Sequence, residues 1–180
     1  MANLGNEKTV SGTDVWLTPP HILKSLGEFD LDPCASIDRP WDTAKKHFTI
    51  EDDGLAQEWE GRVWCNPPYG PPMSKWLNRL AYHPGGGISL IFARTETKAF
   101  FDSVWDKADA ILFLKGRLKF HKPDGTLGGT AGSPSVLIAY GSQEVSVLES
   151  CGLGGKLVYL NNADSPLPSL RLRLGISDGS

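Results

Sequence analysis

The sequence predicts an α/β domain in which a mainly parallel sheet carries helices on both faces. One observation predicts this class. Short apolar stretches alternate along the chain with stretches whose apolar residues recur at helical spacing, which is typical of strands joined by helices. In addition, the longest apolar stretches, at 88–93 and 110–114, are far too short to span a bilayer, so we expect no membrane partner.

The first half of the chain predicts one clear helix and two short strands. Thr18 is expected to cap a helix that starts with a proline in its first turn and stops at Gly27. Residues 29–33 are expected to form a strand that ends in an acid and a proline. A brief strand is expected at 46–50 and a helical turn at 54–59.

The second half predicts a more regular alternation. The expected helices and strands are helices at 74–81 and 97–105, and strands at 62–65, 87–93, 110–114, 134–140 and, at a sheet edge, 155–160. The glycine-rich sequence HKPDGTLGGTAGS, which precedes the strand at 134–140, is expected to form a mobile loop.

Length and composition set further limits. A chain of 180 residues fits one domain, which we expect at 14–160, with a flexible N-terminus at 1–13 and a loosely ordered tail at 161–180. The net charge of −3 argues against a strongly basic nucleic-acid coat protein and leaves room for a local basic face. Three widely spaced cysteines, no metal-ligand spacing and no apolar signal core predict a cytoplasmic protein with reduced thiols and no metal.

The sequence VWCNPPYG at 63–70 predicts a buried strand that two prolines stop. The side-chain oxygen of Asn66 and the carbonyl of Pro67 are neutral acceptors that can converge on one NH2 group. Two acceptors on the hydrogens of a nucleobase amine would localise the lone pair of its nitrogen and make it nucleophilic. Tyr69 can stack on a base that has been extruded from a duplex.

These residues carry a family resemblance. Asn66-Pro67-Pro68-Tyr69 resembles motif IV of S-adenosylmethionine-dependent amino-methyltransferases, and residues 14–140 are similar to the compact phage-type DNA N6-adenine methyltransferases. The resemblance implies a Rossmann-like methyltransferase fold without a separate target-recognition domain. It also implies S-adenosylmethionine as the methyl donor, a flipped adenine in duplex DNA as the substrate, and catalysis by Asn66, Pro67, Pro68 and Tyr69.

The same resemblance implies binding roles for other residues. Contacts with the cofactor are expected from Trp16, Thr18 and Pro19, from Asp32, Pro33, Cys34 and Ala35, and from Asp53 and Leu55. A carboxylate in the second group would pair with the ammonium of the cofactor. The acid that binds its ribose is open among Asp38, Asp42 and Glu51. Contacts with DNA are expected from Arg94, Arg117 and Lys119.

Several alternatives use the same chemistry or the same fold. RNA adenine, the 4-amino group of cytosine and a protein glutamine are possible acceptors, and a catalytically silent DNA-binding or partner-binding module is the non-enzymatic alternative. Because little chain lies outside the catalytic fold, we expect a short or relaxed recognition sequence, or help from a homodimer.

Overall fold

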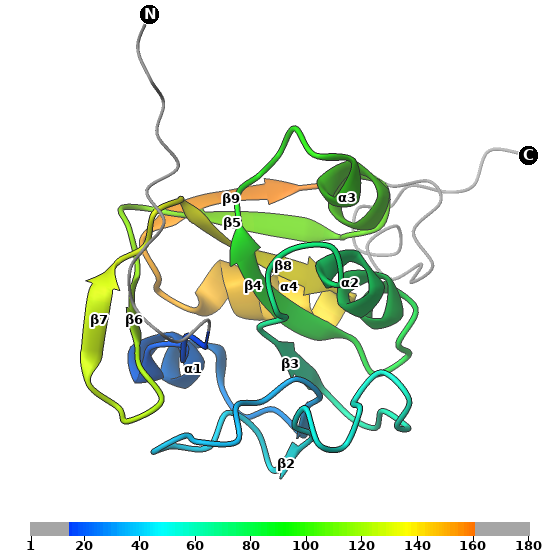
Figure 1. Ribbon diagram of the computed structural model, residues 1–180. Helices are drawn as coiled ribbons and strands as arrows, with labels where there is room; N and C mark the ends of the chain where they lie inside the picture. Colours follow the sequence, from blue (N-terminus) through cyan, green and yellow to red (C-terminus); the bar gives the residue numbers. More distant parts are fainter. Residues whose placement is uncertain (1–14, 161–180) are drawn as a thin grey trace, which may run out of the picture.

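The computed structural model describes residues 15–160 (Figure 1). The flexible N-terminus expected at 1–13 and the loosely ordered tail expected at 161–180 lie outside these residues. Within the described part of the chain, no helix is long and apolar enough to cross a membrane.

A seven-stranded sheet with the order β2-β1-β3-β4-β8-β5-β9 forms the centre of the fold. Its strands are β1 (Leu31–Asp32), β2 (Lys46–His47), β3 (Val63–Cys65), β4 (Gly87–Phe92), β5 (Ala110–Leu114), β8 (Ser135–Tyr140) and β9 (Gly155–Tyr159). Strands β2, β1, β3 and β4 pair in parallel, whereas β8 runs antiparallel to both β4 and β5, and β9 antiparallel to β5.

The sheet is therefore mixed, and the expectation of a mainly parallel sheet is wrong for the half that contains β8, β5 and β9. A parallel return would need a crossover connection of a dozen or more residues, usually a helix. The chain between β5 and β8 contains instead a hairpin of β6 (Lys119–His121) and β7 (Leu127–Thr130). From this hairpin the chain re-enters the sheet at the edge where β5 ended, so β8 must run back along β5.

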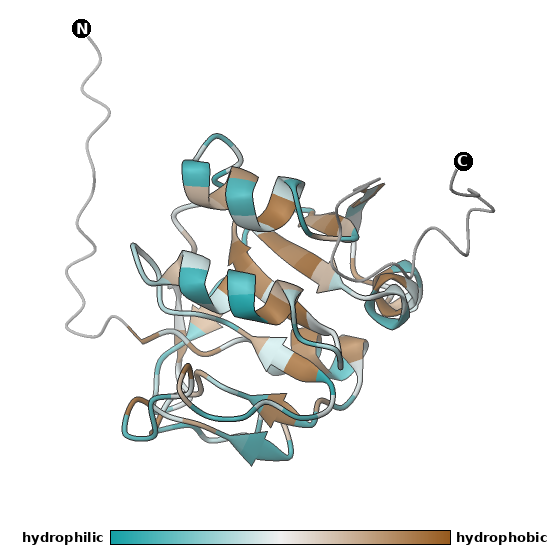
Figure 2. Cartoon of the chain, turned by 90° about the vertical axis from the view of Figure 1, so that its right-hand side faces the viewer, coloured by the Kyte–Doolittle hydropathy of each residue, from teal (hydrophilic) through white to brown (hydrophobic). Residues whose placement is uncertain are grey.

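Helices cover both faces of the sheet, as the sequence predicts. One face carries α2 (Met73–Ala81) and α3 (Lys98–Phe100), which continues as a π-helix, η1 (Phe101–Trp105); the other carries α1 (Pro20–Leu26) and α4 (Ser142–Ser150). Strand β8 shows the division: Ile138 packs into the first core and Leu137 into the second, because successive strand residues point to opposite faces. Figure 2 shows brown, hydrophobic strands between helices that carry both brown and teal.

Most expected elements are present, with several corrections. Thr18 does not cap α1, because the N-cap is Pro19 and no side chain bonds there. The helical turn expected at 54–59 is irregular, and the strand expected at 46–50 is limited to β2. The glycine-rich segment expected to form a mobile loop contains β7 and the turn of the β6–β7 hairpin, for which Asp124-Gly125 was the available turn signal, and α4 was not predicted.

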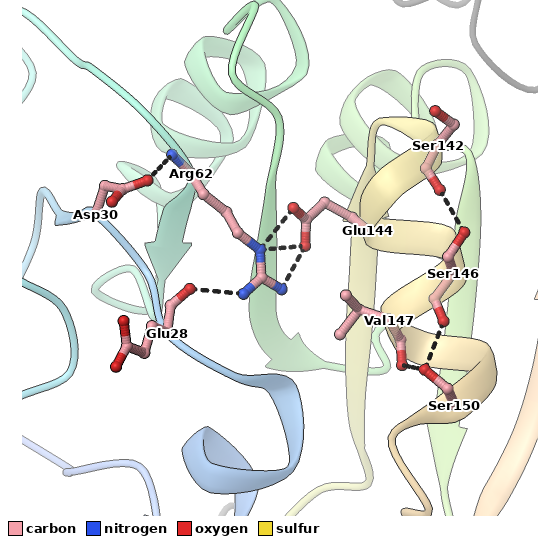
Figure 3. A network of polar contacts seen from close by, with 8 residues as sticks. All are labelled: Glu28, Asp30, Arg62, Ser142, Glu144, Ser146, Val147 and Ser150. Carbon is pink, nitrogen blue, oxygen red and sulfur yellow. Dashed lines mark hydrogen bonds and ion pairs between the residues drawn. The ribbon is translucent and has the colours of Figure 1, made fainter.

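Arg62 connects the amino ends of β1 and β3 to α4, and we call this end of the two strands the anchored end (Figure 3). The guanidinium of Arg62 forms a bidentate pair with Glu144 of α4, at 2.8 Å from Nε to Oε1 and 2.7 Å from Nη2 to Oε2. It also donates to the carbonyl oxygen of Glu28 at 2.8 Å and lies 4.1 Å from the centre of the Phe29 ring. The backbone N–H of Arg62 donates to Asp30. Every polar group of this network has a partner.

Candidate active site

The segments predicted to contain the catalytic and cofactor-binding residues meet at the carboxyl ends of β1 and β3. We call this end of the two strands the site end. Leu31 pairs with Val63, and Cys65 pairs with Ser89, all in parallel register. The carboxyl ends of β1, β3 and β4 therefore lie side by side, as is typical of ligand sites in α/β sheets.

Asn66 follows β3 directly, and its side chain has a defined orientation. Its amide nitrogen Nδ2 donates to the carbonyl oxygen of Trp16 at 3.2 Å and lies 3.4 Å from Oγ1 of Thr18. Because a carbonyl oxygen can only accept, the NH2 group must face Trp16 and the oxygen must face away. This oxygen, Oδ1, is buried and has no hydrogen-bond partner among the described residues. Asn66 thus presents a desolvated acceptor that nothing in 15–160 uses.

The two prolines end β3 and set the course of the chain toward α2. Pro67 is buried and Pro68 is exposed. Neither has an N–H group to continue the ladder. Gly70 adopts a φ of 100°, which favours glycine, and its carbonyl accepts from the N–H of Met73 as α2 starts. The tight path keeps Asn66 and Tyr69 on one short, rigid segment.

Tyr69 stacks on an aromatic residue of β4. Its ring lies 4.3 Å from that of Phe92 at an interplanar angle of 9°, and Phe92 in turn meets Phe120 of β6 edge to face at 6.4 Å. The Tyr69 hydroxyl is buried without a partner among the described residues, and burial raises its pKa. One ring face is thus covered by Phe92, so a base could stack only on the other.

The segment with Trp16, Thr18 and Pro19 joins Asn66 to the hairpin. Leu17 exchanges backbone hydrogen bonds with His121 of β6, at 2.8 and 3.0 Å. A Cβ on Gly128 of β7 would lie 2.6 Å from the Trp16 ring, so only glycine allows this approach. Thr18, expected as a helix cap, is buried and contacts Asn66 instead.

Asp32 is a buried carboxylate at the end of β1. It accepts from the backbone N–H of Cys34 at 3.1 Å and from the hydroxyl of Thr43. Burial raises the pKa of the Asp32 carboxyl to about 6, although both of these hydrogen bonds act in the opposite direction. No ammonium or guanidinium group pairs with it among the described residues, which leaves the carboxylate poorly compensated.

The predicted cofactor-binding segment at 53–55 contacts the one that follows β1. A Cβ on Gly54 would lie 1.9 Å from the carbonyl oxygen of Pro33, so glycine is required for this contact. Gly54 also accepts from the indole N–H of Trp59 at 2.8 Å, and Arg79 donates to the carbonyl of Leu55. Asp53, beside Gly54, is exposed and has a φ of 49°.

Cys34 and Ala35 continue the chain after β1. The N–H of Ala35 donates to the carbonyl of Phe48 at 2.9 Å, and the sulfur of Cys34 lies 3.7 Å from that of Cys65. This contact brings the loop after β1 against the last residue of β3. The three predicted acids for the ribose, Asp38, Asp42 and Glu51, are all exposed.

The three residues predicted to contact DNA are exposed. Arg94 follows β4, Arg117 follows β5 and Lys119 lies on β6. Arg117 has one long hydrogen bond, at 3.5 Å, to the carbonyl of Ala131. No ion pair occupies any of the three within residues 15–160.

Sequence reasoning missed several neighbours of these residues. Thr43 and Phe92 support Asp32 and Tyr69 through long-range contacts that no local pattern signals. Gly128 lay within a glycine-rich stretch, but its contact with Trp16 could not be inferred. In the part of the chain that is described, no three His, Cys, Asp or Glu side chains are placed to hold a metal ion.

Comparison with known protein families gives a match over most of the chain. The model of a family described as DNA N-6-adenine-methyltransferase (Dam) matches residues 5–144. No curated protein and no solved structure matches the chain.

Proposed function

Because the chain belongs to the family of DNA N-6-adenine methyltransferases, we propose that the site end is where an adenine of DNA receives its methyl group. The enzyme is a DNA methyltransferase that acts on the 6-amino nitrogen of adenine. The comparisons offer no support for RNA, cytosine, glutamine or a silent binding module. The proposal concerns which residues of this chain perform the reaction, and how.

The unpartnered oxygen of Asn66 carries the proposal. A buried acceptor without a partner costs about 1–3 kcal/mol, so a fold keeps one where a ligand completes it. The 6-amino group of adenine offers two hydrogens, of which Oδ1 of Asn66 takes one and the carbonyl of Pro67 the other. Accepting both hydrogens draws the nitrogen toward tetrahedral geometry and localises its lone pair. The contacts of Asn66 with Trp16 and Thr18 fix this orientation before the base arrives.

Tyr69 holds the base in position. Its ring is already fixed against Phe92, so stacking a base on its open face costs little side-chain entropy. Stacking on an aromatic ring is worth about 1–3 kcal/mol and offsets part of the cost of extruding the base. Pro68 contributes rigidity to the segment rather than a contact.

We infer that S-adenosylmethionine, which supplies a methyl group on a positively charged sulfur, binds at the site end. The residues assigned to the cofactor contact one another or Asn66 near the site end. Gly54 allows the turn at 53–55 to pack on Pro33, and Cys34 contacts Cys65 at the end of β3. Trp16 and Thr18 contact Asn66. The poorly compensated carboxylate of Asp32 suits the ammonium of the methionine part. We assign the residues Trp16, Thr18, Pro19, Asp32, Pro33, Cys34, Ala35, Asp53 and Leu55 to this binding.

DNA approaches over the basic residues beside the hairpin. Arg94, Arg117 and Lys119 lie on connections that leave the site edge, or on β6, and their charges are free of ion pairs within the described residues. They suit phosphate contacts, which position DNA without reading sequence. We further propose that the substrate is duplex phage DNA, that the enzyme acts in a bacterial cytoplasm and that it forms a homodimer. Free thiols at all three cysteines support a reducing compartment.

The direct test compares Asn66→Ala with Asn78→Ala, which removes an amide of α2 away from the site. Each protein is incubated with S-adenosylmethionine and unmethylated duplex DNA, and N6-methyladenine is measured by mass spectrometry after digestion to nucleosides. We expect Asn66→Ala to lower the rate roughly 10²–10³-fold, the usual loss for one preorganised polar group, while Asn78→Ala keeps the rate per folded molecule. A loss of less than tenfold in Asn66→Ala would contradict the role of Asn66.

A further inference from the structure

The thiol groups of the two cysteines at the site end take no part in the methyl transfer described above, although Cys34 lies in the loop assigned to the cofactor. Cys65 is the last residue of β3 and is fully buried, whereas Cys34 lies after β1 and is partly exposed. Their sulfurs are 3.7 Å apart, and both thiols are free. The third cysteine, Cys151 after α4, is also free but contacts only the carbonyl of Leu148.

From this contact we infer that Cys34 and Cys65 form an oxidative modification site, which hydroperoxides convert to a disulfide that closes the active site. The inference rests on the proposed function for its effect on methylation. The formation of the bond itself does not depend on the proposed function.

The chemistry balances with a hydroperoxide as the oxidant. Cys34, the less buried of the two, attacks the peroxide as its thiolate; the O–O bond breaks, and a sulfenic acid and, after protonation of the leaving oxygen, one molecule of water or alcohol result. The sulfur of Cys65 then attacks the sulfenic sulfur and displaces water, with loss of the Cys65 proton. A thiol reductant reverses the step by thiol–disulfide exchange.

The surroundings of Cys34 make this reaction slow at neutral pH. Its hydrogen bond with Cys65, and burial, raise the pKa of the Cys34 thiol. Since the thiolate is the reactive form, closure should become faster as the pH rises toward that pKa. The site would therefore respond to sustained oxidation rather than act as a fast peroxide sensor.

Closure acts on the residues that flank the pair. The sulfurs must approach from 3.7 Å to about 2 Å. Cys65 is held by its pairing with Ser89 of β4, so the movement falls on Cys34, whose N–H is bonded to Asp32, and on Ala35, whose N–H is bonded to Phe48. The loop assigned to the cofactor is pulled against β3, next to Asn66. Binding of the cofactor should weaken.

The experiment treats the full chain with hydrogen peroxide across a pH series and follows three readouts. Peptide mass mapping measures a peptide that joins Cys34 to Cys65 with the loss of two hydrogens. Calorimetry measures the affinity for S-adenosylhomocysteine, and nucleoside mass spectrometry measures methylation. We expect the linked peptide to appear faster at higher pH, affinity and methylation to fall at least tenfold, and dithiothreitol to restore them.

Three variants make the result specific. Cys151→Ser should respond as the wild type does. Cys65→Ala and Cys34→Ser should each keep their own untreated affinity and rate after peroxide, whatever those values are. Absence of the linked peptide in the wild type overturns the site, and a linked peptide with unchanged affinity overturns its effect on the cofactor. If the untreated protein does not methylate DNA, the proposed function fails, while peptide mapping and calorimetry still decide this inference.

Discussion

The two ends of the β1–β3 pair differ in how their polar groups are satisfied. At the anchored end, Arg62 and Glu144 pair in bidentate geometry, and the carbonyl of Glu28 completes the guanidinium contacts. At the site end, the oxygens of Asn66 and Tyr69 are buried without partners in residues 15–160. One pair of strands therefore carries a polar network that is complete at one edge and incomplete at the other.

Two aspartates that lie two residues apart show the same contrast. The N–H of Arg62 and the ammonium of Lys45 hold the pKa of Asp30 below its usual value. Burial raises the pKa of Asp32 to about 6. The difference indicates that the two ends have different roles. The polar groups of the anchored end stabilise the fold, whereas those of the site end lower its stability and remain available for ligands.

The largest effect on stability should come from breaking the anchored end. Glu144→Ala leaves the guanidinium of Arg62, whose side chain is only 12% exposed, without its carboxylate. Removing one partner of a buried ion pair costs about 3–5 kcal/mol, which urea denaturation would measure as a lower free energy of unfolding. The exposed pair of Lys45 with Asp30 serves as the control, because solvent screens this pair and Lys45→Ala should lower the free energy of unfolding far less. Equal losses in the two variants would contradict the anchoring role.

The second effect is a dependence of stability on pH that comes from Asp32. Its native pKa of about 6 exceeds the ordinary value of 3.8, so the native state binds the proton more tightly than the unfolded state does. The contribution of Asp32 is therefore most favourable below pH 4 and is lost as the pH rises to about 6, by about 3 kcal/mol. Comparing wild type with Asp32→Asn across this range isolates that slope.

Asp30→Asn tests a pH dependence of stability that has the opposite sign. The native pKa of Asp30 is lowered, so this carboxylate stabilises the native state above its unfolded pKa and loses that contribution as the pH falls. The two difference curves should slope in opposite directions. Parallel curves would show that the two ends do not differ electrostatically.

The contrast also explains how far sequence reasoning could go. The position of Asn66 and Tyr69 just beyond the end of a strand was predictable, because a strand that meets two prolines is a local pattern, and the α1 helix followed from its proline and Gly27. Arg62 and Glu144 lie 82 residues apart, and their pairing follows only from the position of α4. The direction of β8 was missed for the same reason: strand direction depends on long-range connections, and hydrophobic periodicity carries no information about them.

The smallest effect should come from removing a single hydroxyl at each of two buried tyrosines. Tyr69→Phe deletes an oxygen that has no partner, so the free energy of unfolding should stay unchanged or rise by about 1 kcal/mol. Tyr140→Phe deletes a hydroxyl that donates to the carbonyl of Ser103 at 2.6 Å, and should lower it by about 1–3 kcal/mol.

Methylation rates distinguish the role of the Tyr69 ring from that of its hydroxyl. Tyr69→Phe keeps the ring and its stack on Phe92, so its rate should stay within a few-fold of wild type. Tyr69→Ala removes the stacking surface, and should lose about 1–3 kcal/mol of base binding, or roughly 5–150-fold. If Tyr69→Phe were as destabilising as Tyr140→Phe, its hydroxyl would have a partner in solution, and the site end would be less incomplete than the structure shows.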